Sequence, residues 1–383
     1  MRYQTAGESH GRALTTIVSS VPAGIPVTAA EIDLDLARRQ GGYGRGGRQR
    51  IETDRVTILS GVRFGRTIGS PIALAVANRD FENWLDVMAV AGERPEGIRE
   101  TAPRPGHADL AGVLKIDSDD TRDILERASA RETAARVAAG GVAKALLRAL
   151  GVEIASYVES VGTVSMASVA DPSAVDRDAV EASGLRCPDP EATEAMKILI
   201  DNARADGESL GGVFVVTATG LVPGLGTYAE ASRRLDARLA AAVVSIPAIK
   251  GFEIGDGFAA AAAPGSKVHD ELHYDSQRGF ERPSNHAGGL EGGMANGEPL
   301  VLRAAMKPIP TLMRPLPSVN LDTLEPVDAS KERSDVCAVP AAAVVAEAEV
   351  AMVLAQVYME KFGGDCLGDM VVARDAYMAR IAR

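Results

Sequence analysis

The 383-residue chain has few aromatic side chains, few cysteines and no excess of positive charge. Aromatic residues make up only 4% of the chain against an apolar fraction of 46%, so a core must be built from Ala, Val, Leu and Ile on closely packed backbones. Cys187, Cys337 and Cys366 are widely spaced and odd in number, which excludes a disulfide framework and a zinc pattern. A net charge of −11 argues against general nucleic-acid affinity, which needs a basic field.

The sequence also lacks a secretory leader and an uninterrupted apolar run of the roughly 18–20 residues that span a bilayer. Met1–Gly11 is polar and reaches a histidine at position 10. We therefore expect a soluble protein of a reducing, cytoplasmic compartment. No break in composition marks a boundary, and we predict a single domain over residues 1–383.

Local patterns predict both helices and strands. Gly251–Met294 is dominated by glycine and polar residues, and we expect a long functional loop there. Helices are predicted from the capping box at Thr28–Glu31 to about Gln40, from just after Ser129 to near Gly151, and over Glu191–Ala205, Ala231–Val244 and Pro340–Phe362. Strands are predicted over Val56–Ser60, Ile72–Ala77, Val152–Val164, Val213–Thr219 and Leu300–Met306.

The first segment that could carry chemistry is Gly7-Glu8-Ser9-His10-Gly11. It matches the G-x-S-x-G nucleophile elbow in form, which leaves a serine hydrolase built on Ser9 as an alternative. A nucleophile elbow follows a strand that belongs to a larger sheet, however, and only six residues precede Gly7. The segment could also be a simple polar turn. A histidine in a Gly-flanked turn can approach a ligand closely, so His10 is a candidate acid or base.

Arg38–Arg50 is the densest positive cluster of this acidic chain, and it is rich in glycine. Glycines let a backbone wrap around an anion, and arginine forks bind carboxylate or phosphate with two hydrogen bonds. The Gly-Lys-Ser/Thr ending of a P-loop is absent. A solvated basic loop and an Arg/Gly-loop binder of single-stranded nucleic acid remain alternatives.

Further segments combine charge with tight turns. A Pro-Gly turn directs His107 within Arg104–Asp109, and Arg127–Thr133 stands at a helix start, where phosphate groups bind or Ser129 simply caps the helix. His269–His273 has the spacing of a zincin helix but lacks its glutamate, so we do not expect a metal there. Three other candidates are Arg282–Gly293, Lys307–Thr311 and Arg333–Cys337.

One faint repeat is visible in the sequence. Glu126-Arg127-Ala128-Ser129 precedes one Ala-rich helix, and Glu332-Arg333-Ser334-Asp335 precedes another. The pair suggests two related halves of the chain.

Taken together and in this order, the segments resemble the chorismate synthase family across nearly the whole chain. The resemblance implies an α+β fold, a β-α-β sandwich with pseudo-symmetric halves and long functional loops, usually assembled as a homotetramer. The blocks that carry it are G-E-S-H-G at Gly7–Gly11, R-R-Q-G-G-Y-G-R-G-G-R at Arg38–Arg48, R-P-G-H-A-D at Arg104–Asp109, R-A-S-A-R-E-T at Arg127–Thr133, N-H-A-G-G-L-E-G-G at Asn285–Gly293, K-P-I-P-T at Lys307–Thr311 and R-S-D-V-C at Arg333–Cys337.

The resemblance further implies a lyase of the shikimate pathway, which serves aromatic amino-acid biosynthesis. Its reaction is the anti 1,4-elimination of phosphate from 5-enolpyruvylshikimate 3-phosphate, giving chorismate. Reduced FMN is required although there is no net redox change. The chain has no obvious extra segment for a flavin reductase, so it resembles the bacterial, monofunctional type, which depends on NADPH only indirectly, through a separate reductase.

Family analogy also implies roles for individual residues. His10 would protonate the departing phosphate, His107 would help protonate the reduced isoalloxazine, and Asp335 would finally accept the proton that leaves the substrate carbon through flavin N5. Pro247 stands where related sequences often have Asn or Gln, which removes one possible flavin contact. Substrate binding is implied for Ser9, Arg39, Arg45, Arg48, Ser129, Arg131 and Arg333. Flavin binding is implied for Arg127, Ala128, Ser129, Pro247, Ala248, Gly292, Lys307, Pro308, Ile309, Pro310, Thr311 and Arg333.

Overall fold

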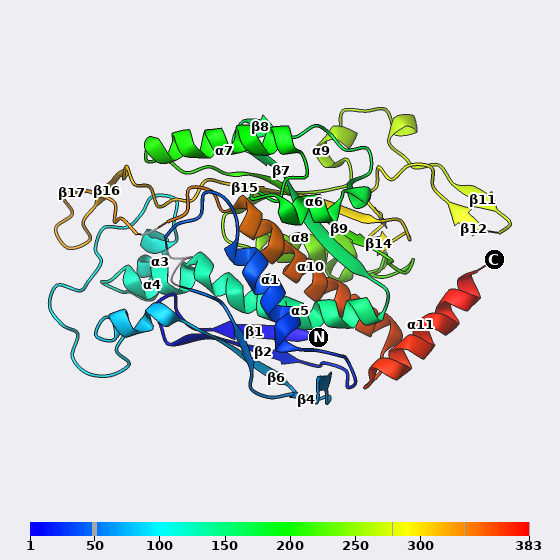
Figure 1. Cartoon of the computed structure of the whole chain (residues 1–383), viewed down its shortest axis with the longest axis horizontal. Coiled ribbons are helices and arrows are strands. Elements are labelled where there is room, and N and C mark those ends of the chain that lie inside the picture. The colour runs from blue at the N-terminus through cyan, green and yellow to red at the C-terminus, as the bar shows by residue number, and fades with distance from the viewer. Residues whose placement is uncertain (48–51, 278, 333, 383) are drawn as a thin grey trace.

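Two antiparallel sheets lie on either side of a layer of helices (Figure 1). The structure is a computed structural model that describes residues 1–47, 52–277, 279–332 and 334–382. The first sheet has the order β1 (Arg2–Ala6), β2 (Ala13–Ser19), β6 (Ile72–Ala77) and β3 (Val56–Ile58). The second has the order β10 (Ile249–Ile254), β15 (Leu300–Met306), β9 (Gly212–Thr219), β7 (Glu153–Val161) and β8 (Val164–Ser165).

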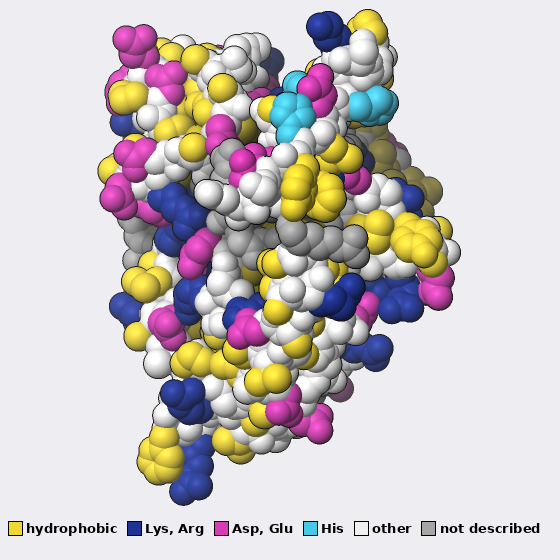
Figure 2. Space-filling model, turned by 90° about the vertical axis from the view of Figure 1, so that its right-hand side faces the viewer, with side chains coloured by type: hydrophobic (Ala, Val, Ile, Leu, Met, Phe, Trp, Pro, Cys, Tyr) yellow, Lys and Arg dark blue, Asp and Glu magenta, His cyan; other side chains and the backbone are white. Residues whose placement is uncertain are grey.

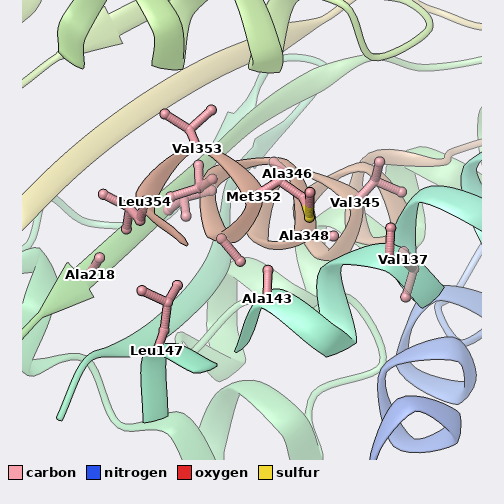
Figure 3. Close-up of a cluster of buried hydrophobic side chains, with 14 of the residues drawn as sticks. Val137, Ala143, Leu147, Ala218, Val345, Ala346, Ala348, Met352, Val353 and Leu354 are labelled. Carbon is pink, nitrogen blue, oxygen red and sulfur yellow. The ribbon is translucent and has the colours of Figure 1, made fainter. Parts of the chain in front are cut away.

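The central layer contains α1 (Ala29–Gln40), α5 (Thr133–Ala149), α8 (Leu235–Val244) and α10 (Val339–Phe362). Helix α5 packs on β2 and β6 of the first sheet, α10 packs on β7 and β9 of the second, and the two helices pack on each other. Figure 3 shows small side chains such as Ala143 and Ala348 at this junction. A Cβ at Gly140 would collide with Ala348, so the helices can approach this closely only with glycine there. The aliphatic, aromatic-poor core expected from composition is thus confirmed.

Helix α10 is long and apolar enough to cross a membrane by length and composition alone. In the fold, 89% of its most apolar stretch is buried, between the second sheet and the other helices. This burial is typical of a core helix in a globular protein.

The two sheets repeat one topology. In chain order the first half runs β1, β2, α1, β3, β6, α5, and the second runs β7, β9, α8, β10, β15, α10, with strands in the order first, second, fourth, third in both sheets. A short hairpin precedes the last strand of each half, β4–β5 (Val62–Arg63, Arg66–Thr67) in one and β13–β14 (Leu290–Glu291, Met294–Ala295) in the other. Single bridges then join Pro26 to Arg66 and Gly226 to Met294. The pseudo-symmetric halves are confirmed.

Both halves contribute to one continuous hydrophobic core. This shared core supports the single domain predicted over residues 1–383, which stays a prediction.

Most predicted elements are found close to their expected bounds, with two corrections at helix starts. Helix α5 begins at Thr133 rather than just after Ser129, because Ser129 caps a short 3-10 turn (Ala130–Glu132) that comes first. Helix α8 begins at Leu235, after another 3-10 turn at Ala231–Arg233. The other α-helices within the described residues are α3 (Asp109–Ile116), α4 (Arg122–Ala128), α6 (Arg177–Ala182), α7 (Pro190–Ala205), α9 (Gly257–Ala260) and α11 (Leu367–Ile381).

The expectation of one long loop over Gly251–Met294 is wrong at its start. Residues 251–254 belong to β10, because their backbone pairs with β15 after a register shift at Gly251. Helix α9 and the hairpin β11–β12 (His273–Asp275, Gly279–Glu281) follow. His269–His273 is not helical, so its two histidines do not share a helix face. A further hairpin, β16–β17 (Pro317–Val319, Pro326–Asp328), lies nearer the C-terminus.

Candidate active site

One cavity of about 400 Å³ gathers most of the predicted site residues. It lies where the two halves meet, beside the starts of α5 and α10. The predicted residues that line it from the first half are Ser9, His10, Arg39, Arg45, His107, Ala128, Ser129 and Arg131. Those from the second half are Pro247, Ala248, Lys307, Ile309, Pro310, Thr311 and Asp335.

Three of the predicted residues that the structure describes are not brought to this lining. The Arg127 guanidinium donates instead to the carbonyl oxygens of Thr5 and Gly7, at 3.0 and 3.1 Å. Gly292 occupies the turn between β13 and β14 with φ of 58°, and Pro308 is also outside the lining. Arg48 and Arg333 lie outside the described residues.

Two buried arginines form one end of the cavity and share a carboxylate. Arg131 Nη1 lies 2.6 Å from Asp54 Oδ1, and Arg39 Nη1 lies 3.4 Å from Asp54 Oδ2. Asn78 accepts from Arg131 Nε at 2.8 Å, and Thr133 Oγ1 accepts from Arg39 Nε at 2.9 Å. Burial lowers the pKa of Arg39 to about 10, which still leaves it charged at neutral pH. Sequence reasoning missed Asp54, because nothing in its local sequence marks it as the partner of two distant arginines.

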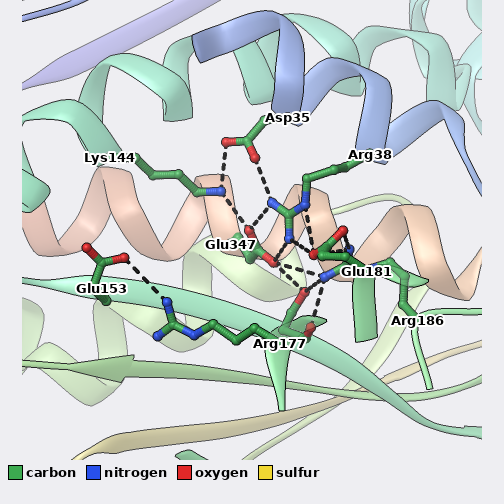
Figure 4. Close-up of polar contacts among 9 residues, drawn as sticks. Asp35, Arg38, Lys144, Glu153, Arg177, Glu181, Arg186 and Glu347 are labelled. Atoms are coloured by element: carbon green, nitrogen blue, oxygen red, sulfur yellow. Dashed lines mark hydrogen bonds and ion pairs between the residues drawn. The ribbon is translucent and has the colours of Figure 1, made fainter. Parts of the chain in front are cut away.

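The neighbouring Arg38 has a structural role. It turns away from the cavity into an ion-pair cluster with Asp35, Glu181 and the fully buried Glu347 of α10 (Figure 4). Lys144 of α5 binds the same Glu347 at 2.6 Å. Burial alone would raise the pKa of Glu347, but these cations hold it well below its usual range. The cluster ties α1 to α5 and α10 and so fixes the helix that presents Arg39.

The Arg-Gly loop packs on the chain that leads into α10. Arg45 Nη1 lies 3.1 Å from Asp335 Oδ2, and the Gly46 N–H donates to Asp335 Oδ1 at 2.6 Å. A Cβ at Gly46 would lie 2.7 Å from the Ser334 carbonyl oxygen, so this approach requires glycine. Through residue 47 the segment is therefore held against the cavity, which disfavours the solvated loop and the nucleic-acid binder.

His107 belongs to a short hydrogen-bonded unit. Its Nδ1 donates to Asp109, whose buried carboxylate also accepts from Arg104 Nε at 2.8 Å. Burial favours the neutral acid, but the hydrogen bonds from His107 and Arg104 outweigh it and hold the pKa of Asp109 well below its usual range. Arg104 Nη1 donates in turn to Thr311 Oγ1 at 2.9 Å, which joins this unit to the Lys307–Thr311 segment. Arg104 and Asp109 belong to the R-P-G-H-A-D block, but the sequence predicted no role for either residue.

His10 lies in the turn between β1 and β2 and faces residues from two other segments. Its Nδ1 is 2.9 Å from Glu126 Oε1 of α4, and its ring stacks on Trp84 at the end of a 3-10 helix, η1 (Arg79–Trp84). Ser9 stands between two strands and not at a strand-to-helix elbow, which removes the context that a hydrolase nucleophile needs. Sequence reasoning missed Trp84 and the role of Glu126; the sole tryptophan of the chain was the only available signal.

The three other histidines, His269, His273 and His286, do not line this cavity and belong to the segment around β11–β12. Figure 2 shows histidines in the upper part of the face that it draws. Within the described residues, no group of three or more His, Cys, Asp or Glu is arranged to hold a metal ion.

Comparison with known proteins identifies the family. The family model described as chorismate synthase matches residues 1–359. The chorismate synthase of Moorella thermoacetica is 60% identical over 96% of this chain and 95% of its own length, and that of Trichlorobacter lovleyi is 57% identical over 99% of both. A solved structure titled "Crystal Structure of Chorismate Synthase" has a TM-score of 0.81 and 42% identity, covering 100% of this chain and 98% of its own. The chain belongs to the chorismate synthase family.

Proposed function

We propose that the protein is a carbon–oxygen lyase that eliminates phosphate from 5-enolpyruvylshikimate 3-phosphate to give chorismate, in the shikimate pathway. The observation that carries this proposal is the meeting of Arg39, Arg45 and Arg131 around one cavity that also holds two histidines and an aspartate. Guanidinium groups bind phosphate and carboxylate through charge-assisted hydrogen bonds, so this group of arginines suits an anionic ligand.

The arginines fit a substrate with one phosphate and two carboxylates. Arg39 and Arg131 are already oriented by Asp54, and Arg45 by Asp335. Among the described residues, Arg45 Nε is buried and has no hydrogen-bond partner, so a donor remains for a ligand oxygen. Ser9 and Ser129 add hydroxyl groups at the same cavity, and Arg48 and Arg333 are proposed to complete the set.

Two groups are proposed to handle protons at opposite sides of the substrate. His10 donates a proton to an oxygen of the departing phosphate, which takes the electron pair of the breaking C–O bond. Asp335 accepts the proton that the substrate carbon loses. Its contacts with Arg45 and the Gly46 N–H stabilise the carboxylate form that such a base needs.

The remaining wall of the cavity fits reduced FMN. Pro247, Ala248, Ile309 and Pro310 offer an apolar surface for a flat ring, with Lys307 beside them. Bound there, reduced FMN would supply the electron-rich ring that assists C–O cleavage without net redox change. His107, held by Asp109, is proposed to exchange a proton with that ring. Arg127, Gly292 and Pro308 are the flavin contacts that this cavity supports least.

The wider setting is also a proposal. The substrate and reduced FMN suffice for activity, and neither nucleic acid nor membrane is needed. We propose a cytoplasmic homotetramer that receives flavin reduced by a separate NADPH-dependent enzyme. Light scattering of the purified protein tests the assembly; a monomeric mass would contradict it.

An anaerobic assay of phosphate release tests the reaction itself. The protein is mixed with 5-enolpyruvylshikimate 3-phosphate and with reduced FMN, oxidised FMN or no flavin. We expect phosphate and chorismate in equal amounts only with reduced FMN. Phosphate release without flavin, or phosphate without chorismate, would overturn the proposal.

A further inference from the structure

We propose that Glu126, Trp84 and Arg122 form a clamp that fixes the ring of His10, so that His10 exchanges its proton with a ligand through Nε2. The three residues are positioning residues, since the clamp acts through His10. The inference rests on the proposed role of His10 as the acid for the departing phosphate.

Glu126 holds both the backbone and the ring of His10. Its Oε2 accepts the His10 backbone N–H at 2.8 Å, and its Oε1 lies 2.9 Å from His10 Nδ1. The Ser9 N–H also donates to the Glu126 carbonyl oxygen at 2.9 Å, so the end of α4 binds this turn at three points. The carboxylate side chain is only 3% exposed, which keeps water from competing for these contacts.

Trp84 fixes the plane of the same ring. The two ring centroids are 3.9 Å apart and the planes differ by 25°, which is a stacked geometry. Trp84 Nε1 lies 3.3 Å from Asp80 Oδ2, which anchors the indole within η1. A hydrogen bond at Nδ1 sets the rotation of the imidazole and stacking sets its tilt, so together they determine the direction in which Nε2 points.

Arg122 connects the parts of the clamp. Its Nη1 is 3.1 Å from Glu126 Oε1, and its guanidinium lies over the Trp84 ring at 5.1 Å from the centroid. Its Nη2 reaches Glu332 at 3.3 Å. Glu126 and Glu332 are the matching glutamates of the two repeat segments, so one arginine ties the His10 side of the cavity to the segment that carries Asp335.

The charges in the clamp determine which ring nitrogen holds the proton. Burial would raise the pKa of Glu126, but hydrogen bonds from His10 and the charge of Arg122 outweigh it, so the pKa lies below its usual value. A carboxylate is an acceptor only, and Nδ1 must then carry hydrogen in neutral and charged imidazole alike. Among the described residues, the charged groups near His10 include Glu126 and Arg122 of α4 and Asp80 of η1, and Glu52, Arg131 and Glu332 line the same cavity.

The test compares Glu126→Gln with Asp123→Asn, which removes an exposed carboxylate from the same helix. The titration of His10 is followed by NMR in the ligand-free protein, with His10→Gln to assign its signal among five histidines. We expect Glu126→Gln to lower the midpoint of that titration by about 1–3 pH units, since an opposite charge next to the ring is lost. Asp123→Asn should leave it within a few tenths of a unit.

Activity is measured on the same variants with reduced FMN. If imidazolium is the proton donor, kcat/KM falls as pH rises through the His10 midpoint, and Glu126→Gln moves that fall to lower pH by the same interval. Trp84→Leu, which loses the stacked ring, should lower kcat more than Trp84→Phe, which keeps one, with KM changed little in either. A role confined to folding would lower the amount of active enzyme without moving the pH profile.

The outcomes separate the clamp from the proposed reaction. An unmoved His10 titration in Glu126→Gln overturns the clamp, whatever the enzyme's activity. If the His10 titration midpoint shifts in Glu126→Gln but the pH at which kcat/KM falls does not, the assignment of His10 as the acid is overturned. The catalytic purpose of the clamp is then overturned with it. Parallel movement of both supports the inference.

Discussion

The two histidines of the cavity are held in the same chemical way but by different parts of the chain. Each presents Nδ1 to a buried carboxylate, and each carboxylate is bound by an arginine. His107 finds Asp109 and Arg104 within a six-residue segment, whereas His10 is 116 residues from Glu126. A local unit forms wherever its turn forms, while a long-range unit forms only when the first sheet and α4 have docked.

The largest expected effect tests whether the two histidines carry comparable parts of the reaction. His10→Ala and His107→Ala should each lower kcat by roughly 10²–10⁴-fold, which is the usual contribution of a positioned acid or base. Turnover with reduced FMN measures this, and circular dichroism confirms that the fold is kept. His269→Ala, at a histidine that does not line the cavity, is the matched control and should retain full activity. Wild-type turnover in either cavity variant would remove that histidine from the mechanism.

Replacing the carboxylate of Asp109 or Glu126 shows how much each histidine-binding unit stabilises the fold. Asp109→Asn removes the charge that pairs with the buried Arg104 and leaves it only neutral or weakened contacts, such as that with Thr311. We expect a loss of about 3–5 kcal/mol in the free energy of unfolding. Glu126→Gln should cost less, about 1–3 kcal/mol, because Arg122 keeps Glu332 as a partner. Urea unfolding curves measure both. Equal losses would mean that the second partner of Arg122 gives no compensation.

Arg45 tests the anion site apart from the two histidines, because its ion pair among the described residues is with Asp335. Arg45→Ala should weaken substrate binding by roughly 1.5–3 kcal/mol, the value of a charge-assisted contact, or about 10- to 150-fold in Kd. Calorimetric titration with substrate measures the change. Arg63→Ala, an exposed arginine of the β4–β5 hairpin, serves as control. Unchanged affinity in Arg45→Ala would refute its place in the anion site.

The smallest expected effect is on how steeply the stability of the folded protein decreases at acid pH. Asp109 and Glu126 have pKa values in the folded protein below their ordinary values of about 4, so their stabilisation is complete above the unfolded pKa and is lost as pH falls through the folded pKa. Asp109→Asn should therefore flatten the decline in stability below about pH 4 more than Glu126→Gln does. Melting temperatures between about pH 3 and 7 test the order. A steeper acid decline in Asp109→Asn than in wild type would contradict the sign.

The short-range unit around His107 was largely predictable. Arg104, His107 and Asp109 lie in one motif, and the Pro-Gly turn between them limits the directions that the histidine can take. Helices with local signals were found as expected, α1 from its capping box and α10 from its apolar length. Strand β10 was missed because its glycine-containing sequence does not indicate a strand. Its backbone pairing with β15 stabilises the extended conformation.

By itself, the sequence indicated the central helices, several strands, the two related halves and the chemical types gathered in each motif, because these depend on propensities and contacts between near neighbours. Only the tertiary structure decided that Asp54 orients two arginines, that Arg38 turns into a structural ion-pair cluster while Arg39 faces the cavity, and that Glu126 and Trp84 hold His10. The physical reason is that a carboxylate or an indole has no local signature for a partner on another element of the fold. Its role is set by which strands and helices the core packing brings together.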